Sequence, residues 1–218
     1  MKRTERHHLK EDEMAHGVHW LAAFYDKYRR EIAIVGAAVV LAAVIFAGLL
    51  AVRAHARSVQ NEAIGRVTAL AAELDQKPDK LADLEKLAAH GRGSRLAGLE
   101  LARYWAERSD WAKADSSLTR LAGGPKDLLY YQAQDLKAQV AAGRKDYGTA
   151  IAIYKKVVEE KPKAYPLDAA LYRLAQSEEL NGETAAALDL YKKLQAEYPQ
   201  SYFGYEASLR AGRLEARK

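Results

Sequence analysis

The side chains of this sequence that could do chemistry do not form a catalytic or metal-binding pattern. The chain has no P-loop, no G-x-G-x-x-G, no H-E-x-x-H and no nucleophile elbow. Cysteine is absent, which excludes disulfides and thiolate metal sites. Adjacent carboxylates such as Glu178 and Glu179 lie in lysine-containing helical patterns and are expected on the surface. The sequence therefore predicts a protein that is not an enzyme, with no catalytic residue, no cofactor and no metal.

Histidine is the remaining candidate ligand, and it gathers near the start of the chain. His7, His8, His16 and His19 stand in a polar, charged segment, where solvated side chains are expected rather than metal ligands. The formal net charge of +5 is spread along the whole sequence. No segment carries the concentrated basic face that nucleic-acid binding requires.

The stretch from Ile32 to Val52 carries no charge, amide or hydroxyl. As a helix it would extend roughly 30 Å, the thickness of the hydrocarbon core of a bilayer. The sequence Ala54-His55-Ala56 resembles a signal-peptidase site, so a cleaved signal peptide is the alternative to a retained anchor. A signal peptide has an apolar region of only about 7–15 residues, which favours the anchor.

Basic residues at the entry to this segment predict its orientation. Lys27, Arg29 and Arg30 precede the apolar run on a short segment, whereas the basic residues after it begin a long domain. Long domains cross a membrane largely regardless of charge, so the first segment is expected in the cytoplasm and the large domain outside. Small residues within the span give a candidate helix-contact face in lipid. This face comprises Gly36, Ala38, Ala42, Ala43, Ala47 and Ala51.

The second half of the chain repeats itself. Residues 150–162, AIAIYKKVVEEKP, and residues 187–199, ALDLYKKLQAEYP, share six of thirteen positions at an offset of 37. No run after Val52 alternates in the manner of a strand. These features predict an all-α fold in four parts: a cytoplasmic tail at 1–31, a transmembrane helix at 32–52, linking helices at 53–93 and a repeat domain at 94–218. Within that domain, repeats are expected at about 94–125, 129–162 and 166–199, with a capping helix at 201–216.

The repeats resemble the tetratricopeptide repeat, a pair of antiparallel helices. Small residues are expected where the paired helices cross, at Ala102, Ala138 and Ala175 on first helices and at Ala114, Ala150 and Ala187 on second helices. One helix pair cannot cover its own apolar face, so the pairs must stack into an array. The last helix is expected to turn Tyr205, Leu209 and Gly212 toward the array. Its charged residues Glu206, Arg210, Arg213 and Arg217 are expected to face water.

In stacked helix pairs the first helices line a groove, and this groove is the candidate partner site. The motif positions that would face it are Leu99, Arg103, Asp135, Gln139, Tyr172, Arg173, Gln176 and Glu179.

The layout of a short tail, one span and an outward repeat domain resembles the YfgM-like proteins of Gram-negative bacteria. The resemblance implies a single-pass inner-membrane protein with its repeat domain in the periplasm. It also implies partners among the Sec translocon subunits and periplasmic chaperones. The small-residue face of the span separately allows a homo-oligomer. The turn from Glu197 to Ser201 is similar to turns in repeats of envelope-assembly proteins. An adaptor of the translocon and an envelope or cell-wall scaffold are therefore both open.

Overall fold

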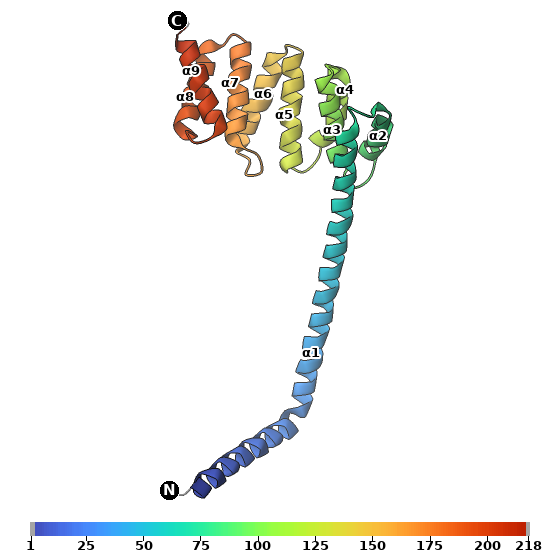
Figure 1. The fold of residues 1–218 in the computed structure, drawn as a ribbon, viewed down its shortest axis with the longest axis vertical. Helices are drawn as coiled ribbons and strands as arrows, with labels where there is room; N and C mark the ends of the chain where they lie inside the picture. Colours follow the sequence, from blue (N-terminus) through green and yellow to red (C-terminus); the bar gives the residue numbers. More distant parts are fainter. Residues whose placement is uncertain (1–2, 217–218) are drawn as a thin grey trace. The chain divides into compact units, whose positions relative to one another are not determined.

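The computed structural model describes residues 3–216 and the side chains of 27–216, except those at 32 and 122 (Figure 1). Within these residues the regular structure is entirely helical. The chain divides into two compact units, Met1–Val59 and Gln60–Lys218. The helices are α1 (Arg3–Glu73), the short 3-10 helix η1 (Pro78–Lys80), α2 (Leu81–Ala89), α3 (Ser94–Glu107), α4 (Trp111–Ala122), α5 (Leu128–Gly143), α6 (Tyr147–Glu160), α7 (Leu167–Leu180), α8 (Thr184–Glu197) and α9 (Tyr202–Glu215).

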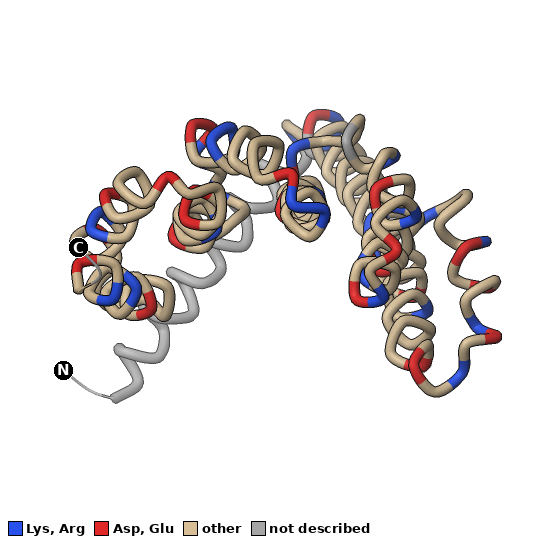
Figure 2. Tube along the Cα trace, turned by 90° about the horizontal axis from the view of Figure 1, so that it is seen from above, with Lys and Arg blue, Asp and Glu red and all other residues tan. Residues whose placement is uncertain are grey.

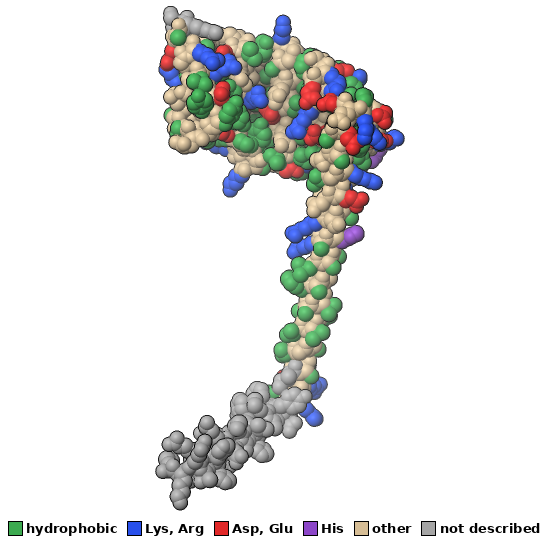
Figure 3. Space-filling model, in the orientation of Figure 1, with side chains coloured by type: hydrophobic (Ala, Val, Ile, Leu, Met, Phe, Trp, Pro, Cys, Tyr) green, Lys and Arg blue, Asp and Glu red, His purple; other side chains and the backbone are tan. Residues whose placement is uncertain are grey.

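The apolar part of α1 has no protein cover in its own unit. Every described side chain from 33 to 58 is exposed, and Val39 and Phe46 each keep 62% of their surface open. Figure 3 shows this apolar surface along the helix. The helix is long and apolar enough to cross a membrane. A signal sequence near the N-terminus can have the same length and composition, so these features fit an anchor and a signal sequence alike.

The second unit is an array of antiparallel helix pairs, which confirms the predicted fold class. The pairs α3/α4, α5/α6 and α7/α8 follow one another in a row and end in α9 (Figure 1). Three of these helices begin at an aspartate whose carboxylate accepts a backbone N–H of the first turn, and α9 begins in the same way at Ser201. Such caps satisfy backbone donors that have no partner within the helix.

Alanine lies at the crossings between paired helices, as the spacing predicts. The six alanines expected there on first and second helices are all completely buried. Because alanine is short, the two backbones of a pair approach closely at these points. Tyr154 and Tyr191, one turn further along the second helices, are buried as well and fill the space toward the next pair.

A further helix pair precedes the first repeat. The end of α1, from Gln60 onward, and α2 share one hydrophobic core with α3, and we call these two segments the N-terminal hairpin. Its core joins Val67 of α1, Leu74 in the turn after α1, Leu84 of α2, and Ala97 and Leu101 of α3. This N-terminal hairpin therefore covers the apolar side that α3 would otherwise present to water.

Helix α9 faces the array with a different side from the one predicted. Ala207, Ala211 and Leu214 are buried against α7 and α8, whereas Tyr205 and Leu209 are 61% and 41% exposed. The prediction for α9 was therefore wrong. The physical reason is the close approach to the preceding turn, where small residues fit and a tyrosine does not.

Candidate protein-binding groove

Three of the predicted groove residues line one hollow between α3 and α5. This hollow, here the α3–α5 hollow, has a volume of about 550 Å³. Arg103 of α3 and Asp135 and Gln139 of α5 are the predicted residues in its lining. The others are Ala106, Glu107, Trp111, Gln132, Leu136 and Tyr165. The hollow thus combines both signs of charge, amide groups and two aromatic rings, which suits a polar peptide surface more than an apolar ligand.

A buried tyrosine, Tyr154, fixes the position of Asp135 through a hydrogen bond. The Tyr154 hydroxyl donates to Oδ1 of Asp135 at 2.8 Å and lies 3.2 Å from its carbonyl oxygen. Burial, and then the negative charge of Asp135, raise the pKa of Tyr154. The same two causes, in the same order, raise the pKa of Tyr165 at the rim of the hollow. Both phenols therefore stay protonated and remain hydrogen-bond donors at neutral pH.

Arg173 extends this polar cluster onto α7. The positive charge of Arg173 partly offsets the effect of Asp135, because it lowers the pKa of both Tyr154 and Tyr165. Its Nη1 donates to Oε1 of Gln176 at 3.4 Å, at the limit of a hydrogen bond. Both side chains are half-buried. The charged side chains of α3 and α5 thus line the α3–α5 hollow, whereas Arg173 of α7 is not part of its lining.

The other predicted groove residues do not present free side chains. Leu99 is completely buried between α3, α4 and α5, and Tyr172 is buried against Phe203 of α9, with ring centroids 5.3 Å apart. Glu179 accepts a hydrogen bond from the Tyr191 hydroxyl at 2.9 Å and pairs with Arg210 at 3.4 Å. These three residues hold the array together, so the groove assignment is corrected for them.

Glu178 is a second correction, because it is buried rather than on the surface. Its side chain is 7% exposed, and Oε1 lies 2.9 Å from Nζ of Lys155 on α6. Its neighbour Glu179 is only partly exposed. A carboxylate at this depth requires its partner, since an unpaired buried charge is costly. The periodicity of the repeat does indicate that position 178 is buried, because Ala141 occupies the same place one repeat earlier and is also buried.

Trp111 and Tyr165 are groove residues that the sequence pattern did not indicate. Trp111 begins α4 and rests on Gly143, where an added Cβ would lie 2.6 Å from the ring. Tyr165 lies in the loop between α6 and α7, outside any helical period. The absence of a side chain at Gly143 is the one signal for the place of Trp111. A loop residue such as Tyr165 has no comparable signal.

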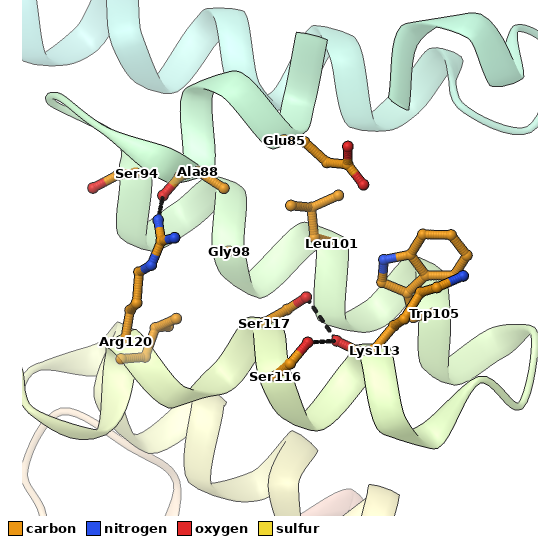
Figure 4. Close-up of a pocket in the computed structure, with 11 residues that line it drawn as sticks. Glu85, Ala88, Ser94, Gly98, Leu101, Trp105, Lys113, Ser116, Ser117 and Arg120 are labelled. Atoms are coloured by element: carbon orange, nitrogen blue, oxygen red, sulfur yellow. Dashed lines mark hydrogen bonds between the residues drawn. The ribbon is translucent and has the colours of Figure 1, made fainter. Parts of the chain in front are cut away.

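A smaller cavity of about 260 Å³ lies between α2, α3 and α4 (Figure 4). Several of its polar groups are engaged within the protein. Arg120 donates to the carbonyl of Ala88 at 2.6 Å, and the hydroxyls of Ser116 and Ser117 both donate to the carbonyl of Lys113. The Lys113 ammonium lies 4.0 Å from the centre of the Trp105 ring. The cavity is thus a packing gap beside the N-terminal hairpin.

The charges of the second unit do not gather into a patch of one sign among the described residues. Figure 2 shows basic and acidic residues interspersed along the helices of the second unit. Among the described residues there is no group of three metal-ligating side chains. The side chains of His7, His8, His16 and His19 lie outside the described ones. The small residues of the span, from Gly36 to Ala51, are exposed, and no atom lies within 4 Å of a Cβ built at Gly36 or Gly48.

Comparison with known families supports the repeat assignment. A family profile described as a tetratricopeptide repeat matches residues 169–201, which hold most of α7, all of α8 and the turn that follows. No curated protein and no solved structure matches the chain significantly. Tetratricopeptide repeats stack into extended surfaces that bind other proteins. The matched repeat therefore indicates a protein–protein interaction module.

Proposed function

We propose that this chain is a membrane-anchored, non-enzymatic module that binds a protein partner in the α3–α5 hollow. The observation that carries the proposal is the meeting of Arg103, Asp135 and Gln139 around one hollow of peptide size. These residues come from two first helices, and the hydrogen bond from the Tyr154 hydroxyl fixes the Asp135 carboxylate in place. Side chains fixed before binding lose less entropy when the partner docks.

The resemblance to YfgM-like proteins supports a more specific partner. In that proposal α1 anchors the chain in a bacterial inner membrane, with the N-terminus in the cytoplasm and the array in the periplasm. The array then links the Sec translocon to periplasmic chaperones. The alternative partner is an envelope-assembly or cell-wall complex, in which the array serves as a scaffold.

Purification in mild detergent tests the partner and the site together. The full chain is expected to retain translocon subunits or periplasmic chaperones, and the double variant Arg103→Glu with Asp135→Arg is expected to lose them. Lys156→Glu is the matched control, because Lys156 is exposed on the second helix α6. Loss of the partner from the control as well, or retention by the double variant, would contradict the proposed site. Recovery of cell-wall enzymes in place of translocon subunits would favour the scaffold.

A topology reporter tests the anchor. A reporter that is active only in the periplasm, fused after Lys218, is expected to be active in cells. The mass of the protein recovered from membranes is expected to equal that of the full chain. A product that begins after Ala56 would instead show that the apolar segment is a cleaved signal sequence.

A further inference from the structure

Helix α9 carries a second apolar face that no other described residue of its unit covers. Tyr202, Tyr205 and Leu209 are 70%, 61% and 41% exposed, and Gly212 and Ala216 beside them are exposed as well. We call these five residues the α9 stripe. The buried residues Ala207, Ala211 and Leu214 lie on the other side of the same helix. A helix that is apolar on two opposite sides is typical of one packed between two partners.

The spacing of the α9 stripe matches a helix-to-helix seam. Its residues follow one another at intervals of three, four, three and four, the a and d positions of a heptad. The face lies directly opposite the core face, because at 100° per residue Leu209 is about 200° from Ala207. A seam with this period fits the side of another α-helix.

The sizes of the residues along the stripe favour an identical helix running in the opposite direction. The stripe begins with two tyrosines and ends with a glycine and an alanine. In an antiparallel pair the tyrosine end of each copy meets the small end of the other, and Leu209 lies near the two-fold axis. A Cβ built at Gly212 has no neighbour within 4 Å, so the space for an aromatic ring is open.

The charges that flank the stripe are complementary in the same arrangement. Glu206 and Arg213 both follow a d position, and they lie three residues before and four residues after Leu209. Antiparallel pairing therefore brings Glu206 of each copy beside Arg213 of the other. Salt bridges at such flanking positions set partner choice and orientation. Neither residue forms an ion pair with another described residue of its own chain.

We propose that two copies of this chain associate through an antiparallel, two-fold contact between their α9 stripes. The same surface then serves on both copies, as two-fold symmetry requires. The contact explains why an exposed helix position holds Gly212, since glycine within a helix is less stable than alanine by about 1 kcal/mol. The α9 contact is separate from the α3–α5 hollow and does not depend on the partner bound there.

Cysteine cross-linking of the full chain in mild detergent tests this contact, and the chain offers a clean background because it contains no cysteine. Leu209→Cys is expected to give a covalent dimer with a short bismaleimide. Leu180→Cys is the control, because Leu180 is 60% exposed on α7 but lies outside the stripe. The dimer yield at position 209 should exceed that of the control by about tenfold. Equal yields at the two positions would overturn the proposal.

A charge exchange in the Leu209→Cys background distinguishes the specific antiparallel contact from non-specific association of the two copies. Arg213→Glu places like charges together at both ends of the contact and should reduce the cross-linking yield by about tenfold. Adding Glu206→Arg restores opposite charges and should restore the dimer, which also shows that the variants fold. An unchanged yield in the single variant, or no recovery in the double variant, would contradict the antiparallel pairing of two copies.

Discussion

At the scale of single residues, Gly204 determines how α9 joins the array. A Cβ at this position would collide with the carbonyl group of Tyr198 in the preceding turn. Gly204→Ala is expected to lower the free energy of unfolding by about 1–3 kcal/mol, because the turn and the helix must move apart. Urea denaturation followed by circular dichroism measures this change.

Gly65→Ala provides the control, because a Cβ there meets no atom within 4 Å. This substitution is expected to leave stability unchanged or to raise it by up to about 1 kcal/mol through better helix propensity. Equal effects of the two substitutions would show that Gly204 is not at a close contact.

Asp127 caps α5 and makes an ion pair with Arg95, at 2.6 Å between Oδ2 and Nη1. The hydrogen bond from Arg95, with help from the backbone N–H of Tyr130, holds the pKa of Asp127 below its usual range. A lowered folded pKa stabilises the fold above the unfolded pKa, and this stabilisation is lost as the pH falls through the folded value. Asp127→Ala should therefore cost about 1 kcal/mol at pH 7 and progressively less below about pH 4.

Asp75→Ala is the matched control for the cap. Asp75 also pairs with an arginine, at 2.9 Å from Arg108, but its side chain is 77% exposed and caps no helix. Exposed ion pairs of this kind contribute little to stability. Urea midpoints at pH 7 should separate the two variants, and a difference that persists at pH 2 would contradict the assignment of the effect to ionised Asp127.

Ala150 tests the crossing between α5 and α6. Its side chain is completely buried, so Ala150→Leu should destabilise the array by about 1–3 kcal/mol through overpacking. Ala152→Leu, two residues away on the exposed side of the same helix, should change stability by less than about 0.5 kcal/mol. Unchanged urea midpoints for both would mean that Ala150 is not at a helix crossing.

At the scale of elements, the N-terminal hairpin behaves in the structure as part of the array. Leu84 of α2 is completely buried in the core that joins α1, α2 and α3. Leu84→Ala is expected to cost about 2–5 kcal/mol, whereas Leu180→Ala, at an exposed position, should cost almost nothing. A small effect of Leu84→Ala would show that the hairpin is only a linker.

The repeat helices could be predicted from sequence because their crossings require alanine at a fixed offset. Ala150 and Ala187 stand 37 residues apart and occupy the same place in successive pairs. The face of α9 could not be predicted in this way, because residues 202–216 carry two apolar stripes and periodicity alone does not rank them. The deciding contact is Gly204 against the turn at Tyr198, which is a property of the folded chain.

At the scale of the whole molecule, the hairpin sets the limits of the folding unit. A fragment of residues 57–218 should unfold at the same urea concentration as the array in the full chain. A fragment of residues 94–218 should unfold earlier, because it exposes Ala97 and Leu101, which the hairpin covers. Equal midpoints for the two fragments would contradict the role of the hairpin as an integral part of the array.

The candidate groove was only partly predictable from the sequence. Motif positions indicated Arg103, Asp135 and Gln139, which do line one hollow. The same positions also indicated Leu99, because the repeat pattern does not show how deeply neighbouring pairs interlock. The contribution of Tyr165 comes from a loop whose path depends on the packing of α6 and α7.

The exposed helical segment between the span and the array has a consequence for proteolysis. Residues 53–58 are all exposed, and none belongs to a core cluster, the first of which begins at Val67. A single protease cut in this segment would release the array with every core residue still attached. With the proposed anchor, the same folded domain would exist as a membrane-bound form and as a released form, and cleavage here would change its location without unfolding it.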